Sequence, residues 1–320
     1  MKKVLNFTGT SKIFFSISIA IFIIGIICNC IFGVTLDIQF TGGTIIQYNY
    51  TGDIDTDAMK DLIQKETADT VSFNISENIT VGDDDNQLQN GYLLAVQFSG
   101  KKTITPDIMN NLTTELQSAY PDNNFKMVDS QSVESSMGWK FFLKCITAVA
   151  IACVLMVIYV AFRFKKIGGL SAGVMALVAL FHDVLMIYFT FIILRMPIDS
   201  NFIAVTLMIL GYSLNDTIVI YDRVRENERL MPDSEISDVV NVSINTSLKR
   251  NAITSLTTFV AVMTIVAVSE LFGLSTLRTF AVPMAFGIVS GAVSSLFIAG
   301  PIWVLWKRHK AKKADNTKKK

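Results

Sequence analysis

The sequence predicts an α-helical polytopic membrane protein with six transmembrane helices and an α+β ferredoxin-like extracytoplasmic domain between helices 1 and 2. The chain has 320 residues, of which 51% are hydrophobic and only 17% are charged, whereas a soluble domain carries about a quarter charged residues. The apolar residues also gather in long blocks, and a bilayer core about 30 Å thick needs about 20 such residues per helix. The blocks are Ile13–Phe32, Trp139–Phe162, Gly169–Leu194, Ser200–Tyr221, Ala252–Phe272 and Leu277–Trp306.

Charge divides the chain into four parts. Residues 1–34 form an amino terminus with helix 1, 35–138 the extracytoplasmic domain, 139–306 helices 2 to 6, and 307–320 a basic tail. Residues 35–138 carry 16 acidic and 5 basic side chains, a net charge of −11, so the rest of the chain carries +12. Basic residues in short loops mark the cytoplasmic side of a membrane. They lie at the amino terminus and after helices 2, 4 and 6, so both termini are predicted to be cytoplasmic.

The segment 35–138 alternates strand-like and helix-like patterns. Their order, βαββαβ, is that of the ferredoxin-like arrangement. An acidic turn, Gly82–Asn90, joins the two middle strands. The predicted strands are Thr44–Tyr50, Val71–Ile79, Tyr92–Phe98 and Asn124–Val133, and the predicted helices are Asp55–Thr67 and Thr105–Tyr120.

Two polar segments and one stripe of small residues complete the helical part. Asp222–Lys249 mixes both signs of charge and is predicted to be an amphipathic surface helix. The tail Lys307–Lys320 is interpreted as an anchor at anionic membrane lipids rather than a nucleic-acid site. Helix 6 carries a small residue at every fourth position, which lets another helix approach closely. These residues are Gly287, Gly291, Ser295 and Ala299.

Several kinds of chemistry have no motif here. The sequence contains no Gly-x4-Gly-Lys-Ser/Thr loop for a nucleotide and no His-Glu-x2-His pair for zinc. It has only two histidines, and its four cysteines lie in or beside apolar helices. We therefore expect no enzyme activity, no cofactor and no metal site, and any work must draw on an energy source other than bound nucleotide.

The informative residues are charges within the apolar blocks. Asp216 lies six residues before Asp222, which places it about 9 Å inside the apolar layer. An aspartate at the membrane centre costs about 2.5–3.5 kcal/mol, so such a residue is a functional candidate. Arg250 opens helix 5 from the cytoplasmic side. Burial favours the neutral carboxyl and a nearby guanidinium favours the charged one, so their balance predicts that Asp216 gains and loses a proton.

Polar residues continue from both charges along one face of each helix. On helix 4 they include Tyr212 and Ser213, one turn before Asp216. Because helices 4 and 5 are antiparallel neighbours, we expect the two polar faces to meet inside the bundle. The face on helix 5 consists of Arg250, Thr254, Thr257, Thr258 and Ala261.

Each candidate also has a purely structural interpretation. For Asp216 and Arg250 we favour ion coupling over an ion pair that only fixes helix packing. His182 and Asp183, in the middle of helix 3, fit both interpretations equally. The remaining secondary candidates for ion coupling are Asn215, Thr217, Ser213 and Thr254, of which Asn215 and Thr217 are more typical of interhelical packing.

Residues Gly211 to Asn227, GYSLNDTIVIYDRVREN, resemble the helix 4 signature of the SecF subunits of the SecD/SecF family, in the RND superfamily. Further similarities support the resemblance and span nearly the whole chain. They are Phe40–Thr44, His182-Asp183, Asn245–Arg250 and Ser294–Pro301.

The resemblance implies a function in protein export. Members of the family are bacterial cytoplasmic (inner) membrane proteins in which SecF pairs with SecD, and the two six-helix halves resemble one RND-type transporter. They associate with the SecYEG channel, often with YajC, and use the proton gradient, or sodium in some relatives, to pull an unfolded preprotein outward. The helix 4 aspartate and helix 5 arginine, here Asp216 and Arg250, are implicated in ion flow.

Three hypotheses follow from these observations. The first is an ion-coupled SecF-type export subunit whose domain at 35–138 binds unfolded segments weakly. The second is an RND-type exporter of lipids or small molecules, although such exporters usually carry both six-helix halves in one chain. The third is a scaffold in which Asp216 and Arg250 only hold the bundle together.

Overall fold

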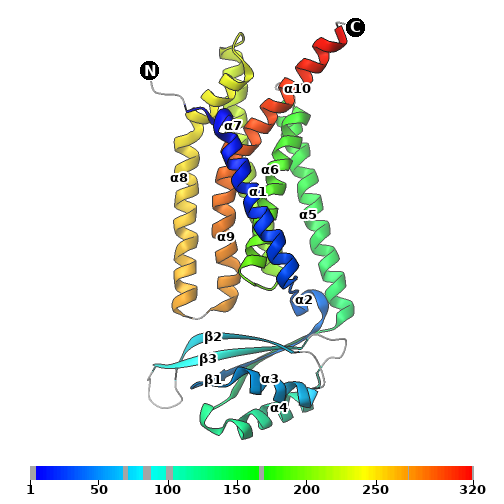
Figure 1. The fold of residues 1–320 in the computed structure, drawn as a ribbon, viewed down its shortest axis with the longest axis vertical. Helices are drawn as coiled ribbons and strands as arrows, with labels where there is room; N and C mark the ends of the chain where they lie inside the picture. The colour runs from blue at the N-terminus through cyan, green and yellow to red at the C-terminus, as the bar shows by residue number, and fades with distance from the viewer. Residues whose placement is uncertain are drawn as a thin grey trace.

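The structure, a computed structural model, consists of a long helical bundle with a small α/β domain at one end (Figure 1). It describes residues 5–67, 71–81, 88–98, 104–165, 169–272 and 274–318. Within these ranges, 6 helical segments are long and apolar enough to cross a membrane. The chain is therefore a multi-pass membrane protein, and both ends of the described chain lie at the end of the bundle away from the domain.

The helices of the bundle agree with the predicted apolar blocks, but two of them continue well beyond. Polar residues extend α7 to Leu230, and α8 already begins at Ile236. The predicted amphipathic surface helix Asp222–Lys249 is therefore correct only in part: residues 222–230 continue α7, whereas residues 236–249 form the first part of α8, at the end of the bundle. Hydropathy detects only the apolar part of a helix. The bundle consists of α1 (Phe7–Phe32), α5 (Ser135–Arg163), α6 (Gly169–Ile193), α7 (Ser200–Leu230), α8 (Ile236–Leu271) and α9 (Ser275–Ser294).

The sixth predicted helix is interrupted. A π-helical turn, Ser295–Ala299, separates α9 from α10 (Gly300–Lys318). Pro301 follows directly and has no N–H to donate to the carbonyl one turn before it. As a result α10 leans away from the line of α9 (Figure 1). The predicted basic tail is helical as far as Lys318, and residues 319–320 lie outside the described chain.

The α/β domain has the predicted βαββαβ element order. Its sheet has the strand order β2-β3-β1-β4, with all neighbours antiparallel. Alternate residues of the central strands, such as Ile46 and Leu94, are fully buried against α3 and α4. Both helices lie on the side away from the bundle, so the other face of the sheet is turned toward it (Figure 1). The predicted acidic turn falls partly on residues 82–87, outside the described chain. The elements are α2 (Ile38–Thr41), β1 (Gly43–Tyr50), α3 (Thr56–Thr67), β2 (Val71–Val81), β3 (Leu88–Phe98), α4 (Pro106–Ala119), a 3-10 turn (Pro121–Asn123) and β4 (Lys126–Val133).

The domain is attached to the bundle at both of its ends. On the incoming side, Leu36 and Ile198 form a parallel β-bridge, in which Ile198 N–H donates to the Thr35 carbonyl (2.9 Å) and Asp37 N–H to the Ile198 carbonyl (3.0 Å). On the outgoing side Gly138 touches α2: a Cβ there would lie 2.9 Å from the backbone carbonyl of Phe40. Between the sheet and the bundle lies a cleft of about 720 Å³.

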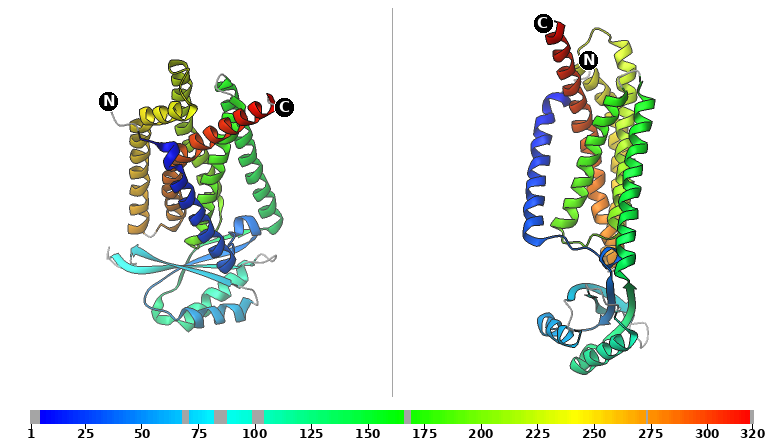
Figure 2. Two further views of the ribbon diagram at one scale, coloured as in Figure 1. Left: turned by 45° about the horizontal axis from the view of Figure 1, so that its top comes forward. Right: turned by 90° about the vertical axis from the view of Figure 1, so that its right-hand side faces the viewer.

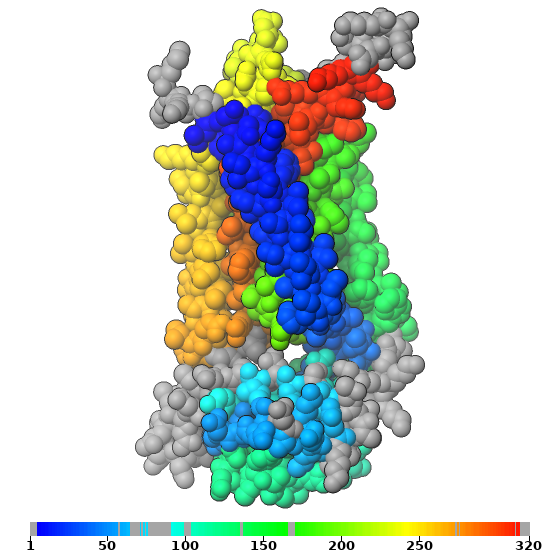
Figure 3. All heavy atoms as spheres, in the orientation of Figure 1, coloured from blue at the N-terminus to red at the C-terminus, as the bar shows by residue number. Residues whose placement is uncertain are grey.

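At the opposite end, α1 is held by the first part of α8, which lies across the end of the bundle (Figure 2). The Asn245 amide accepts from the Leu5 N–H (3.0 Å) and donates to the Leu5 carbonyl (2.9 Å). The Asn241 amide likewise accepts from the Thr8 N–H and donates to the Thr8 hydroxyl, both at 3.0 Å. From there α1 crosses the face of the bundle obliquely (Figure 3).

Candidate functional site

Asp216 is buried within the bundle, as predicted. It lies on the inner face of α7 and is 2% exposed. Its Oδ2 accepts a hydrogen bond from the Ser255 hydroxyl of α8, at 3.3 Å. The inner face of α7 follows the helical period through Ser213, Asp216, Thr217 and Ile220, all buried. The carboxyl group therefore lies buried between two helices and has one donor among the described residues.

Arg250 lies near Asp216 but does not form an ion pair with it. Within the described chain, no carboxylate lies within 4.0 Å of the Arg250 guanidinium, although its positive charge still acts on Asp216. Arg250 is exposed and lines an open pocket of about 610 Å³ on the outer side of α7, together with the exposed Asn215. Asp216 is not among the lining residues. The arginine and the aspartate thus reach the α7–α8 contact from different sides.

The predicted meeting of two polar stripes is therefore wrong for α8. Arg250, Thr254 and Thr257 are exposed, and the Thr254 hydroxyl donates within its own helix, to the carbonyls of Arg250 and Asn251, both at 3.0 Å. The face that packs on α7 begins one residue later, with Asn251 and Ser255. Both faces of α8 are polar, and consecutive residues differ by about 100° around a helix. Periodicity alone does not distinguish which of two polar faces is buried.

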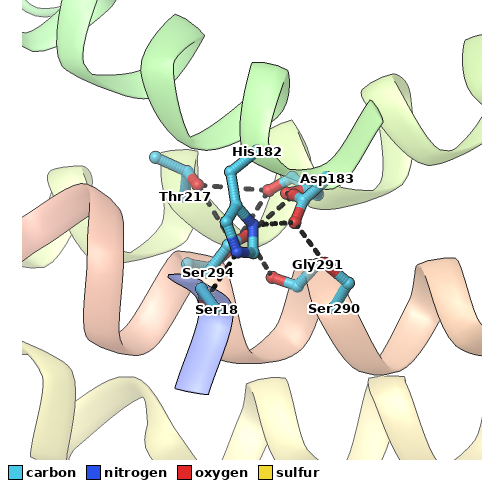
Figure 4. Close-up of polar contacts among 9 residues, drawn as sticks. Ser18, His182, Asp183, Thr217, Ser290, Gly291 and Ser294 are labelled. Atoms are coloured by element: carbon cyan, nitrogen blue, oxygen red, sulfur yellow. Dashed lines mark hydrogen bonds and ion pairs between the residues drawn. The ribbon is translucent and has the colours of Figure 1, made fainter. Parts of the chain in front are cut away.

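His182 and Asp183 form the centre of a second buried cluster (Figure 4). Asp183 is 0% exposed and accepts hydrogen bonds from three serine hydroxyls, each at 2.7 Å, and its Oδ1 lies 3.2 Å from His182 Nδ1. The other ring nitrogen, Nε2, lies 2.8 Å from the Ser18 hydroxyl of α1. The serine donors are Ser213 of α7 and Ser290 and Ser294 of α9. One carboxylate thus joins α6 to α7 and α9, and through His182 to α1.

A single turn of α7 connects the two clusters. The Ser213 hydroxyl bonds Asp183, and the Ser213 carbonyl accepts from the hydroxyls of Thr217 and Ser295, both at 3.2 Å. Thr217 follows Asp216 directly, and its hydroxyl lies 3.2 Å from that of Ser295. Ser213 and Thr217 are thus buried contacts between helices, while Asn215 and Thr254 are exposed. The close approach of α9 that this needs depends on Gly291, where a Cβ would lie 3.1 Å from Ser213 Cβ.

Reasoning from the sequence missed the hydroxyl partners. Ser255, Ser290 and Ser294 are serines in largely apolar helices, and their burial beside a carboxylate is what marks them as part of a site. The spacing of four between Ser290 and Ser294 is the one signal that the sequence holds. Among the described residues, no three His, Cys, Asp or Glu side chains gather where they could hold a metal ion.

A third acidic pair lies outside the membrane-spanning segments, where the domain meets the bundle. Burial raises the pKa of Asp199 to about 6; the backbone N–H of Phe202 opposes this effect and the negative charge of Asp37 adds to it. Burial also raises the pKa of Asp37, against a hydrogen bond from the Gln39 N–H. Asp199 is the N-cap of α7, and both carboxyl groups line the cleft beneath the sheet.

Comparison with known proteins gives one consistent result. Residues 111–309 match the family described as "Protein export membrane protein SecD/SecF, C-terminal". The protein translocase subunit SecF of Sebaldella termitidis is 34% identical over 90% of this chain and 87% of its own length. That of Alicyclobacillus acidocaldarius is 30% identical over 98% and 96%.

Longer fused proteins match as well. The protein translocase subunit SecDF of Bacillus subtilis is 29% identical over 96% of this chain, which spans 39% of that protein. The crystal structure of SecDF, a translocon-associated membrane protein from Thermus thermophilus, superposes with a TM-score of 0.79 at 25% identity. The superposition covers 96% of this chain and 39% of that one. The fold of this chain is thus similar to about two fifths of a SecDF chain.

Proposed function

The chain belongs to the SecD/SecF family of protein export membrane proteins, and from this premise we propose that it is an ion-coupled SecF-type subunit of the secretion machinery. In this proposal it acts with a SecD partner and uses the proton or sodium motive force to promote late translocation and release of unfolded preproteins. SecYEG, and also YajC, are the proposed neighbours in the membrane.

The observation that carries the proposal is the buried carboxyl group of Asp216. A structural aspartate inside a bundle is expected to be fully satisfied, as Asp183 is by three hydroxyls and a histidine. Asp216 has one donor at 3.3 Å and a guanidinium whose charge acts on it without contact. Such a group is poised to change its charge. Moving one charge through 100 mV is worth about 2.3 kcal/mol, enough to bias a bundle with two arrangements.

The orientation of the chain follows from its charge. We place both termini in the cytoplasm and the ferredoxin-like domain outside the membrane, because the basic residues flank the opposite end of the bundle. The domain's net charge of −11 disfavours acidic partners. Its open sheet face and the cleft beneath it are where an emerging polypeptide is proposed to bind.

Two observations support a SecD partner. Relatives such as SecDF of Bacillus subtilis join a region similar to this chain to further sequence in one polypeptide. In addition, the exposed side of α8 carries a polar stripe of Arg250, Thr254 and Thr257 beside apolar residues such as Leu256, and a charged side chain within a span is stable when protein or water covers it. An RND-type exporter of lipids or small molecules is the second candidate, and it would also need a second six-helix half.

Substitution of Asp216 by Asn tests the proposal. The amide oxygen still accepts from Ser255, so folding is preserved while the titratable charge is lost. In membrane vesicles that contain the chain and its partner, we expect the completion of preprotein translocation to lose its acceleration by a proton or sodium gradient. Asp233→Asn, in the exposed turn between α7 and α8, is the matched control.

The outcomes separate the three hypotheses. If the gradient accelerates export equally in Asp216→Asn and wild-type vesicles, Asp216 only holds the bundle together and the ion-coupled function is wrong. If the purified chain brings down a second six-helix half but vesicles lacking it export preproteins normally, the exporter candidate is favoured. Deleting the domain at 35–138 is expected to leave the helices inserted and abolish the gradient-dependent step.

A further inference from the structure

A buried polar row on α8 leads from Asp216 toward the end of the bundle where the termini lie. Its members recur at every fourth position and all face the interior. Their exposed fractions are 0% for Ser243, 3% for Ser247, 3% for Asn251 and 8% for Ser255. The Ser255 hydroxyl donates to Asp216 at one end, and the Ser243 hydroxyl accepts from the Asn227 amide (2.8 Å) at the other.

The two middle members lack partners. The Ser247 hydroxyl and both polar atoms of the Asn251 amide are buried without a hydrogen bond to any described residue. Buried polar groups are nearly always bonded to protein or to ordered water. Three unpartnered atoms on neighbouring turns of one helix indicate a common ligand that is small enough for a closed interior, donates and accepts, and needs no charge. Water meets all these conditions.

The length of the row fits a file of water molecules. Asp216 and Asn227 are eleven residues apart on α7, so the stretch between the two partnered contacts is about 16 Å long. That length holds a file of a few water molecules. The open pocket on the other side of α7 is a poorer route, because it does not reach Asp216 and is lined by arginines. These are Arg223, Arg225, Arg229 and Arg250.

We propose that Ser247 and Asn251 hold a short file of ordered water that carries protons between Asp216 and the terminus-side end of the bundle. The inference rests on the proposed function, in which Asp216 releases a proton. The hydroxyl and amide both donate and accept, so each holds a water molecule in either orientation. Their own protonation does not change: a proton lost by Asp216 enters the file, and another leaves it into bulk water.

The water file is tested with silver ions on single-cysteine variants. The four free cysteines, Cys28, Cys30, Cys145 and Cys153, are first replaced by Ala. Ag⁺ is small enough to follow a water file and reacts with thiols. In the assembled complex we expect Ag⁺ to block later maleimide labelling of Ser247→Cys and Asn251→Cys. Val262→Cys is the matched control, because Val262 is 4% exposed on the same helix in apolar surroundings.

Proton flux provides the second measurement. In proteoliposomes of the complex, Asn251→Leu is expected to slow the proton flux after a pH jump about tenfold, since the file loses its central partner. Asn251→Ser restores a polar group and is expected to restore the flux. Ser269→Ala, which removes a buried hydroxyl bonded within its own helix, controls for hydroxyl loss.

Unprotected cysteines at 247 and 251 would overturn the water file, and so would normal flux in Asn251→Leu. Either result leaves the proposed function intact if Asp216→Asn still abolishes flux. Normal flux in Asp216→Asn would instead overturn the proposed function itself, so the two failures are distinguishable.

Discussion

At the scale of single residues, two buried aspartates on neighbouring helices have opposite environments. Asp183 accepts hydrogen bonds from three serine hydroxyls, each at 2.7 Å, and these replace the hydrogen bonds that water would otherwise donate to the carboxylate. Asp216 has one longer hydrogen bond, from Ser255. A carboxylate so fully bonded is suited to holding helices together, and one with few partners is suited to changing its protonation state. We therefore propose a structural role for Asp183 and ion coupling for Asp216.

Asp183→Asn is expected to destabilise the protein without mimicking Asp216→Asn. The amide nitrogen cannot accept from a serine hydroxyl, so at least one buried hydroxyl loses its partner, at a cost of about 1–3 kcal/mol. A lower melting temperature of the purified protein in detergent would show this loss. Asp233→Asn, on the surface, should melt like the wild type. An unchanged melting temperature for Asp183→Asn would contradict the structural role.

At the scale of elements, the junction between domain and bundle contains a pH-sensitive pair. Asp37 begins α2 and Asp199 begins α7, and the β-bridge between Leu36 and Ile198 brings these two helix starts together. The raised pKa of Asp199, about 6, means that the folded state binds a proton more readily than the unfolded chain. Its contribution to stability is therefore complete below about pH 3.9 and is lost as the pH rises through about 6.

Asp199→Asn is expected to remove this pH dependence. Asparagine caps a helix as well as aspartate does, so α7 keeps its start. Between about pH 5 and about pH 7.5, the wild type should lose more melting temperature than the variant does. Asp37→Asn, which removes the neighbouring charge, should move the wild-type transition to lower pH. Parallel melting curves for wild type and Asp199→Asn would show that the pair does not titrate in this range.

The positions of the helices and strands were largely predictable from the sequence, but which face of a helix is buried was not. Apolar blocks of about 20 residues located the spans, and short strand-like runs located the strands, because both signals are local. The burial of Asn251 instead of Arg250 depends on how α8 packs against α7 and α9, which no local pattern records. The serines around His182 and Asp183 come from three helices, so the cluster exists only in the folded bundle.

At the scale of the whole molecule, the membrane-facing sides of the bundle differ in polarity. The exposed faces of α1 and α5 are apolar, as expected toward lipid, and include Ile24 and Leu155. The exposed side of α8 is also largely apolar, with Leu256 61% exposed, but near its first membrane turns it carries a polar stripe of Arg250, Thr254 and Thr257. A polar face at membrane depth is stable when protein or water covers it. We therefore propose that this stripe, together with the outer side of α7, faces the SecD partner.

Thr257→Trp is therefore expected to disrupt pairing with SecD, because a bulky ring within the proposed contact prevents close packing. Co-purification of the two subunits from solubilised membranes measures the effect. Leu155→Trp adds the same side chain to the exposed face of α5, where Leu155 is 60% exposed, and should leave the pair intact. Equal recovery of SecD with both variants would place the interface elsewhere.

The α/β domain is attached to the bundle at both of its ends, and this limits how it can move. The segment that enters the domain, residues 35–37, is hydrogen-bonded to Ile198. The segment that leaves the domain continues into α5, where Gly138 contacts α2. With two attachments, the domain cannot rotate freely about either one alone. We therefore expect any displacement of the domain to move the adjoining ends of α1, α5 and α7 together with it.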